Sequence, residues 1–227
     1  MLWTARALAL ALVALWTVGV STTASGGTQV SSHINAYVGI FEGQTTHNLT
    51  RPESTTITAT FSSSAGTDGV PIQLWADTYN TNWHKLPVSL ITNNLGKVSL
   101  SRAPKNTTRY QFRFAGDSAR APSQSVVLTI GVHTKVTLSL NDASLRIGQT
   151  LVARGATYPP KPGMTATLWR VAPVGWTKLK TSTIRSDGTY RITKVFNSSG
   201  PRSLVVTVPA GAGNLKGTSP ARSVSVG

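Results

Sequence analysis

The sequence repeats itself once, with nearly constant spacing. Each copy reads Leu-Trp, then a loop of six or seven residues, then Trp-x-Lys-Leu. The copies are Leu74-Trp75 with Trp83-His84-Lys85-Leu86, and Leu168-Trp169 with Trp176-Thr177-Lys178-Leu179. The two loop-closing tryptophans lie 93 residues apart, and the next turn glycines, Gly96 and Gly188, lie 92 apart. A long repeat with small loop changes indicates two copies of one domain.

Within each copy, short alternating runs separated by Gly, Pro, Asn and Ser predict β-strands. Tyr110, Phe112 and Phe114 alternate in the first copy as Leu204, Val206 and Val208 do in the second. The chain is therefore predicted to be all-β, with two tandem Greek-key β-sandwiches over residues 25–132 and 133–227. The link at Gly131-Val132-His133-Thr134 is short, which limits relative motion of the domains.

The order of these motifs resembles the tandem immunoglobulin-like domains of secreted and surface proteins of actinobacteria. The residues that carry the resemblance are Trp83, Gly96, Arg109-Tyr110, Gly116-Asp117, Ser123 and Ser125 in copy one, and Trp176, Asp187-Gly188, Tyr190 and Ser219-Pro220-Ala221-Arg222 in copy two. It covers about residues 50–227, so the residues before it are expected to form an N-terminal extension. It implies a spacer, an adhesive module or an appendage to an enzyme, and no enzyme domain is expected within these residues.

The N-terminus has the pattern of a secretory signal peptide over residues 1–24. Arg6 precedes an apolar stretch from Ala7 to Val20, and small residues follow, with cleavage expected after Ala24 or Ser25. Fourteen helical residues would cover roughly 21 Å of a hydrocarbon layer about 30 Å thick, which is too short for a membrane anchor. The mature chain is thus expected to be extracellular, without a transmembrane segment, and either released or held at the cell wall by non-covalent contacts.

The inventory of chemical groups argues against an enzyme. The chain has no Cys, which excludes disulfides, thiol catalysis and Cys-ligated zinc. The second copy holds only Asp142 and Asp187 as acids, and no tight His or carboxylate cluster predicts a metal site or a cofactor. A secreted hydrolase using His47 or His84 with a Ser of the first domain is the rival hypothesis, although no G-x-S-x-G elbow is present.

A third hypothesis is a protease inhibitor that acts through an exposed loop. The segment Tyr158-Pro159-Pro160-Lys161-Pro162 is stiff because three prolines flank its lysine. A stiff, extended loop can insert into a protease, but it is equally typical of a plain connection between strands.

Charge is distributed unevenly between the two copies. Residues 25–132 carry 8 Lys and Arg against 5 Asp and Glu, whereas residues 133–227 carry 13 against 2. With a net charge of +11 on one small sandwich, the like charges repel one another, and solubility alone requires a smaller net charge. The second domain is therefore predicted to bind an anionic polysaccharide or a teichoic-type phosphate polymer. No motif for specific nucleic-acid binding is present, and the sequence does not indicate the oligomeric state.

Strand alternation identifies candidate binding residues, because side chains alternate between the core and the solvent. It predicts outward side chains at Trp169, Trp176, Lys178, Lys180 and Arg191 in the second copy, and at Trp75, Trp83 and Lys85 in the first. The two tryptophans of each copy flank a short hairpin loop, so a cross-strand pair is expected. Such a pair can form an aromatic surface for sugar rings, or it can simply pack on itself and on lysine stems.

Overall fold

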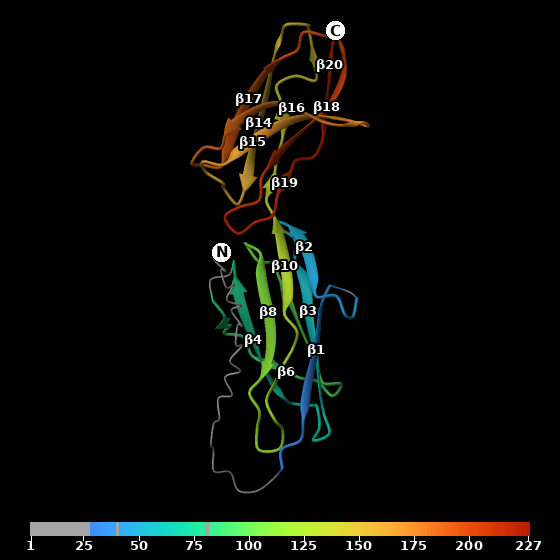
Figure 1. The fold of residues 1–227 in the computed structure, drawn as a ribbon, viewed down its shortest axis with the longest axis vertical. Helices are drawn as coiled ribbons and strands as arrows, with labels where there is room; N and C mark the ends of the chain where they lie inside the picture. The colour runs from blue at the N-terminus through green and yellow to red at the C-terminus, as the bar shows by residue number, and fades with distance from the viewer. Residues whose placement is uncertain (1–27, 40, 80–81) are drawn as a thin grey trace, which may run out of the picture.

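The structure, a computed structural model, describes residues 28–39, 41–79 and 82–227. The predicted signal peptide lies outside the described residues. All regular secondary structure in the described part is β-strand, and no helix there is long and apolar enough to cross a membrane. Two β-sandwiches follow one another along the long axis of the molecule, with the C-terminus at the far end of the second (Figure 1).

Domain 1 comprises the described residues up to 132 and consists of two sheets. The first sheet has the strand order β1 (Ser32–Val38), β3 (Thr55–Ser63) and β7 (Lys97–Arg102). The second has the order β2 (Thr46–Thr50), β10 (Leu128–His133), β8 (Thr108–Phe114), β4 (Pro71–Thr78) and β5 (His84–Lys85), with β6 (Leu90–Ile91) on β4 and β9 (Ser123–Gln124) on β8.

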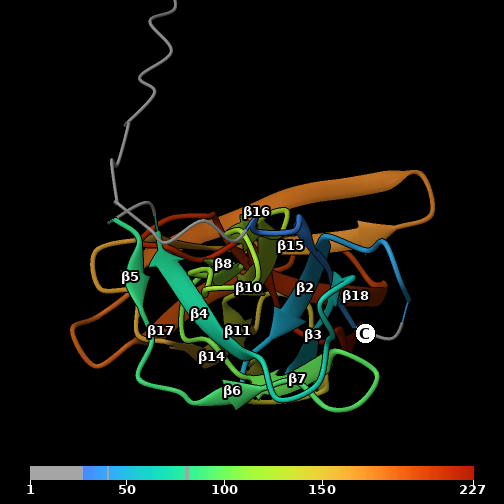
Figure 2. The ribbon, with the colours of Figure 1, turned by 90° about the horizontal axis from the view of Figure 1, so that it is seen from below.

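Domain 2, residues 133–227, repeats this arrangement. Its first sheet is built on β14 (Thr150–Tyr158), which pairs with β11 (Lys135–Val136), β12 (Ser139–Leu140) and β17 (Thr189–Val195). Its second sheet has the order β13 (Ser144–Leu145), β20 (Arg222–Val226), β18 (Gly200–Val208), β15 (Thr165–Ala172) and β16 (Gly175–Thr183), with β19 (Gly217–Thr218) on β18. The β15–β16 hairpin projects from the side of the domain (Figure 2).

The topology is that of immunoglobulin-type sandwiches, in which strands A, B and E share one sheet and C, F and G share the other. In domain 1 these places are taken by β1, β3 and β7, and by β4, β8 and β10. In domain 2 they are taken by β11 with β12, β14 and β17, and by β15, β18 and β20. Two tandem sandwiches are present, which confirms the predicted fold class.

The expected N-terminal extension is part of the first sandwich, which corrects the sequence interpretation. Residues 32–38 pair with β3 along their whole length, and residues 46–50 pair in parallel with β10. His33 and His47 therefore lie on strands. The motifs of the repeat begin only after these strands, so a comparison of the two copies missed them.

Each sandwich has its own hydrophobic core, formed by the alternate residues that face inward from both sheets. Phe61, Phe112 and Ile130 are fully buried in domain 1, and Leu151, Leu168 and Val206 are fully buried in domain 2. The two cores contain no residue in common. Each domain therefore buries one face of each of its sheets without a contribution from the other domain.

A loop of domain 2 closes the junction between the domains. We refer to residues 209–216, between β18 and β19, as the junction loop. The Thr107 amide of domain 1 donates a hydrogen bond to the Gly213 carbonyl (2.8 Å), and the Asn214 side-chain amide donates to the Lys105 carbonyl (3.0 Å). The Leu215 amide donates to the Val132 carbonyl (2.8 Å). These bonds fix the end of domain 1 against domain 2.

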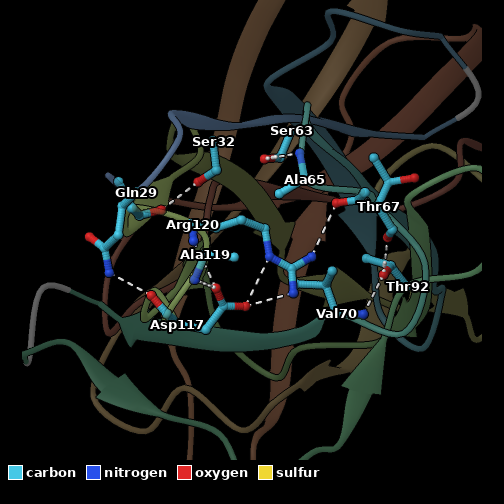
Figure 3. Close-up of polar contacts among 12 residues, drawn as sticks. Gln29, Ser32, Ser63, Ala65, Thr67, Val70, Thr92, Asp117, Ala119 and Arg120 are labelled. Atoms are coloured by element: carbon cyan, nitrogen blue, oxygen red, sulfur yellow. Dashed lines mark hydrogen bonds and ion pairs between the residues drawn. The ribbon is translucent and has the colours of Figure 1, made fainter. Parts of the chain in front are cut away.

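The opposite end of domain 1 has a comparable arrangement, shown in Figure 3. Arg120 donates to the Asp117 carboxylate (2.6 Å) and to the Gly66 carbonyl (3.1 Å), and Gln29 donates to the Asp117 carbonyl (2.5 Å). The hydrogen bond from Arg120 holds the pKa of Asp117 below its usual range. In each domain, a residue where the chain enters forms a parallel bridge with the loop before the last strand. The pairs are Val30 with Arg120 in domain 1 and His133 with Leu215 in domain 2.

Candidate binding surface

The two tryptophans of domain 1 are covered by arginines of the same domain. The Arg113 guanidinium lies over the Trp75 ring, 4.4 Å from its centroid, and over the Trp83 ring at 5.7 Å. Arg109 lies over Trp83 at 5.6 Å and forms an ion pair with the buried Asp77. Both tryptophans are only half-exposed, and Lys85 lies opposite Trp75 on the neighbouring strand. The rings of domain 1 thus stack with cations of their own chain.

The corresponding pair in domain 2 is more open. Trp169 and Trp176 lie with their ring centroids 6.3 Å apart at an interplanar angle of 57°, and 47% of Trp176 is exposed. The Trp169 indole donates a hydrogen bond to the Thr207 hydroxyl (2.8 Å), which fixes its ring on the sheet. This geometry provides one anchored ring and one accessible ring.

Two lysines accompany these rings. Lys178 is exposed and lies directly opposite Trp169 on β16, and the Lys216 ammonium lies 5.7 Å from the centre of the Trp176 ring. We call Trp169, Trp176, Lys178 and Lys216 the Trp176 cluster. Sequence alternation missed Lys216, because it lies in the junction loop, 40 residues from Trp176 along the chain.

The structure separates two predicted residues from this cluster. A bulge between Leu168 and Trp169 places Lys180 opposite Leu168, a core residue, rather than on the register of Trp169. Arg191 lies on β17, in the other sheet, where it pairs with Arg154. Both side chains are exposed, but Lys180 shares the register of Leu168 and Arg191 lies in the other sheet, so the proposed grouping of these two residues with the tryptophans is wrong. Alternation predicts whether a side chain faces the core or the solvent, but it does not predict which of the two sheets carries that side chain.

The basic charge of domain 2 is not neutralised by its own carboxylates. Among the described residues the ion pairs are Asp77–Arg109 and Asp117–Arg120, and both lie in domain 1. In domain 2, Asp142 accepts a hydrogen bond from the Ser144 amide (2.9 Å), and Asp187 accepts bonds from Thr189. Those bonds lower the pKa of Asp187. The two acids of domain 2 therefore stabilise turns.

The lysine of the proline-rich loop is buried, which contradicts an inhibitor that inserts it into a protease. Lys161 is 2% exposed, and its ammonium donates to the Gly211 and Ala212 carbonyls (3.0 and 3.1 Å) and to the Asn214 side-chain oxygen (2.7 Å). Burial lowers the pKa of Lys161. Tyr158, at the start of the loop, stacks with Arg51 of domain 1 at 5.3 Å. The segment is thus held at Tyr158 by domain 1 and at Lys161 by the junction loop.

In the described residues, neither histidine considered for hydrolysis is hydrogen-bonded to a serine, although His47 and Ser54 line the same pocket. His47 on β2 and His84 on β5 occupy opposite edges of one sheet. The ring of His84 bonds the Asn82 carbonyl (3.4 Å), and no hydrogen bond in the described part joins a histidine to a serine. Nor do the described residues include a group of His, Asp or Glu that could hold a metal ion.

Comparison with known proteins finds solved structures that are similar at low sequence identity. No protein-family model matches the chain, and no curated protein matches it. A solved tetra-tandem repeat from the extending region of a large adhesion protein is 13% identical, over 87% of this chain and 49% of that one, with a TM-score of 0.38. The D0–D1 domain of intimin is 12% identical, over 87% of this chain and 97% of that one, with a TM-score of 0.31. This chain spans about half the length of the adhesion-protein structure.

Proposed function

We propose that this chain is a secreted, non-enzymatic binding or scaffold protein of the actinobacterial tandem immunoglobulin-like kind, and that its second domain associates with anionic cell-envelope or extracellular polymers. The observation that carries the proposal is the charge of domain 2, with 13 basic residues against 2 acidic ones and no internal ion pair among its described residues. Unpaired surface cations attract polyanions at long range and release counterions on contact.

The Trp176 cluster supports a polymer that contains sugar rings. An exposed indole face stacks on the apolar face of a ring, while neighbouring ammonium groups pair with phosphate or carboxylate. Lys178 and Lys216 supply those ammonium groups beside Trp176. The arginine-covered rings of domain 1 lack an equally open face, so domain 1 is assigned the scaffold role.

The proposal is tested by measuring binding of the mature chain to polyglycerol phosphate and to polygalacturonate, with dextran as the neutral polymer. At low salt we expect Lys178→Gln combined with Lys216→Gln to weaken binding about tenfold, or roughly 1.4 kcal/mol. The slope of log affinity against log salt should become shallower, because fewer cations release counterions. Trp176→Ala should weaken binding and leave the salt slope unchanged.

Lys85→Gln is the matched control, because Lys85 occupies the place of Lys178 in the repeat and is also exposed. It should change the affinity by less than twofold, well under 0.5 kcal/mol. Equal losses at Lys85 and Lys178, or binding that does not respond to salt, would show that domain 2 is not the polymer-binding domain.

A further inference from the structure

A groove of about 490 Å³ opens beside the junction of the two domains. One wall is formed by β11 and the residues that follow it, the other by β19 and the start of β20, and Thr50 of domain 1 closes one end. Ligand sites occur preferentially at domain interfaces and have volumes of about 300–1,000 Å³. The groove has the size and the location of a small-ligand site.

The floor of the groove is apolar and firmly held. It is formed by Val136 and Leu138, which are buried, together with Pro220. The carbonyl between these two floor residues, that of Thr137, accepts a hydrogen bond from the Tyr190 hydroxyl. Val136 and Leu138 close the bottom of the groove, and the exposed Pro220 supplies the apolar surface that can pack against the C–H face of a sugar ring.

Two cations stand at the rim. Lys135 and Arg222 both line the groove and both are exposed. The Arg222 Nε donates to the Leu138 carbonyl (3.1 Å), which holds the guanidinium at the edge of the floor. A guanidinium held in this way binds a carboxylate or a phosphate with its terminal nitrogens.

Hydroxyl groups complete the lining. Thr50 and Thr218 are exposed at the rim, and each hydroxyl can donate or accept a hydrogen bond. The Thr137 hydroxyl is already engaged with the Ala156 backbone on the neighbouring strand. No carboxylate is among the lining residues. At the domain 1 end, the Glu53 carboxylate accepts a bond from the Thr50 amide (2.7 Å). Lys135 lies near that end, two residues after His133, which pairs with Thr50, so an anionic group is favoured further along the groove, near Arg222.

We propose that this groove binds one sugar ring that carries a carboxylate or a phosphate. The ring lies on the floor, its hydroxyls bond Thr50 and Thr218, and its anionic group pairs with Arg222, while Lys135 adds to the positive potential of the groove. The inference rests on the proposed function, since the ligand is one unit of an anionic polymer. The site is distinct from the Trp176 cluster, because β18 and β15 separate β20 from β16 in the sheet.

The test is a titration of the ¹⁵N-labelled mature chain with glucuronate, glucose 6-phosphate and, as the neutral probe, glucose. We expect the two anionic sugars to shift the amide signals of Thr137, Thr218 and Arg222, and glucose to bind at least tenfold more weakly. Lys135→Gln and Arg222→Gln should each weaken binding of the anionic sugars at least fivefold. Arg222→Lys, which keeps the charge, should recover part of the affinity.

Lys178→Gln is the control that removes the same charge from domain 2 outside the groove, and it should leave the sugar titration unchanged. An equal loss in Lys178→Gln and Lys135→Gln, or shifts spread over the surface of domain 2, would overturn the groove in favour of a diffuse charge field. Polymer binding without sugar shifts at the groove would refute this inference alone. Sugar binding at the groove without polymer binding would refute the proposed function instead.

Discussion

At the scale of single residues, each domain uses one cation to hold the loop that precedes its last strand. In domain 1, Arg120 has a carboxylate partner in Asp117. In domain 2, Lys161 reaches the corresponding loop from another segment and has three uncharged oxygens as its partners. A buried ammonium without a carboxylate loses hydration, and the hydrogen bonds to those oxygens have to offset that loss.

We expect Lys161→Met to lower the free energy of unfolding by about 2 kcal/mol, because it removes the donor from the buried Asn214 side-chain oxygen and from two carbonyls of the junction loop. Urea denaturation followed by tryptophan fluorescence measures this change. Lys178→Met, at an exposed position of the same domain, should change stability by less than about 0.5 kcal/mol. An unchanged or higher stability in Lys161→Met would mean that the desolvation of the ammonium outweighs its hydrogen bonds.

At the scale of elements, β14 organises the first sheet of domain 2. It pairs with β11 at its C-terminal end, with β12 nearer its middle, and with β17 along seven residues. Gly155 of β14 lies beside Thr137, which belongs to the segment that connects β11 to β12. A Cβ atom there would lie 2.0 Å from the Thr137 carbonyl oxygen and 2.5 Å from the Tyr190 hydroxyl. The close approach of three strands therefore requires glycine.

Gly155→Ala is expected to destabilise domain 2 by about 2–3 kcal/mol, because backbone atoms would have to move to relieve the overlap. Thermal unfolding observed by circular dichroism provides the measurement. Gly227→Ala is the matched control, since a Cβ at Gly227 meets no atom within 4 Å. If the two variants unfold at the same temperature, β14 tolerates a side chain at this crossing.

At the scale of the whole molecule, the domains are joined by more than a covalent link. The Leu215 amide donates to the Val132 carbonyl (2.8 Å), and the Asn214 side chain bonds both the Lys105 carbonyl and the Lys161 ammonium. The same side chain thus accepts a bond from the buried cation of domain 2 and donates one to the backbone of domain 1. Binding at either proposed site takes place beside this junction, since Lys216 and Lys135 belong to its immediate surroundings.

Asn214→Ala should uncouple the two sandwiches. In the wild type we expect one cooperative calorimetric transition, and in the variant two transitions or a clearly broadened one, because the side-chain bonds of Asn214 across the junction are lost while each core remains. Asn197→Ala, at an exposed position of domain 2, serves as the control and should retain the wild-type profile. Two separate transitions already present in the wild type would refute the coupling.

The sequence predicted the fold through its repeat, because strand alternation and turn residues are local properties. The candidate site was predicted less completely. The outward position of Trp176 follows from alternation, whereas the arginines that cover Trp75 and Trp83 come from β8, which no local pattern connects to them. The burial of Lys161 depends on the junction loop, 50 residues further along the chain. Contacts of that kind follow from the packing of the domains.

The parallel pairing of β2 with β10, and of β13 with β20, has a mechanical consequence. In each domain, a strand close to the point where the chain enters runs beside the last strand, in the same direction. A force that pulls the two ends of the molecule apart slides such strands past each other. All hydrogen bonds of the ladder are then loaded in shear at the same time. Strands that are peeled apart from one end lose their bonds one at a time. Of the two parallel ladders, that of domain 1, with five residue pairs, should resist such shear better than that of domain 2, with two.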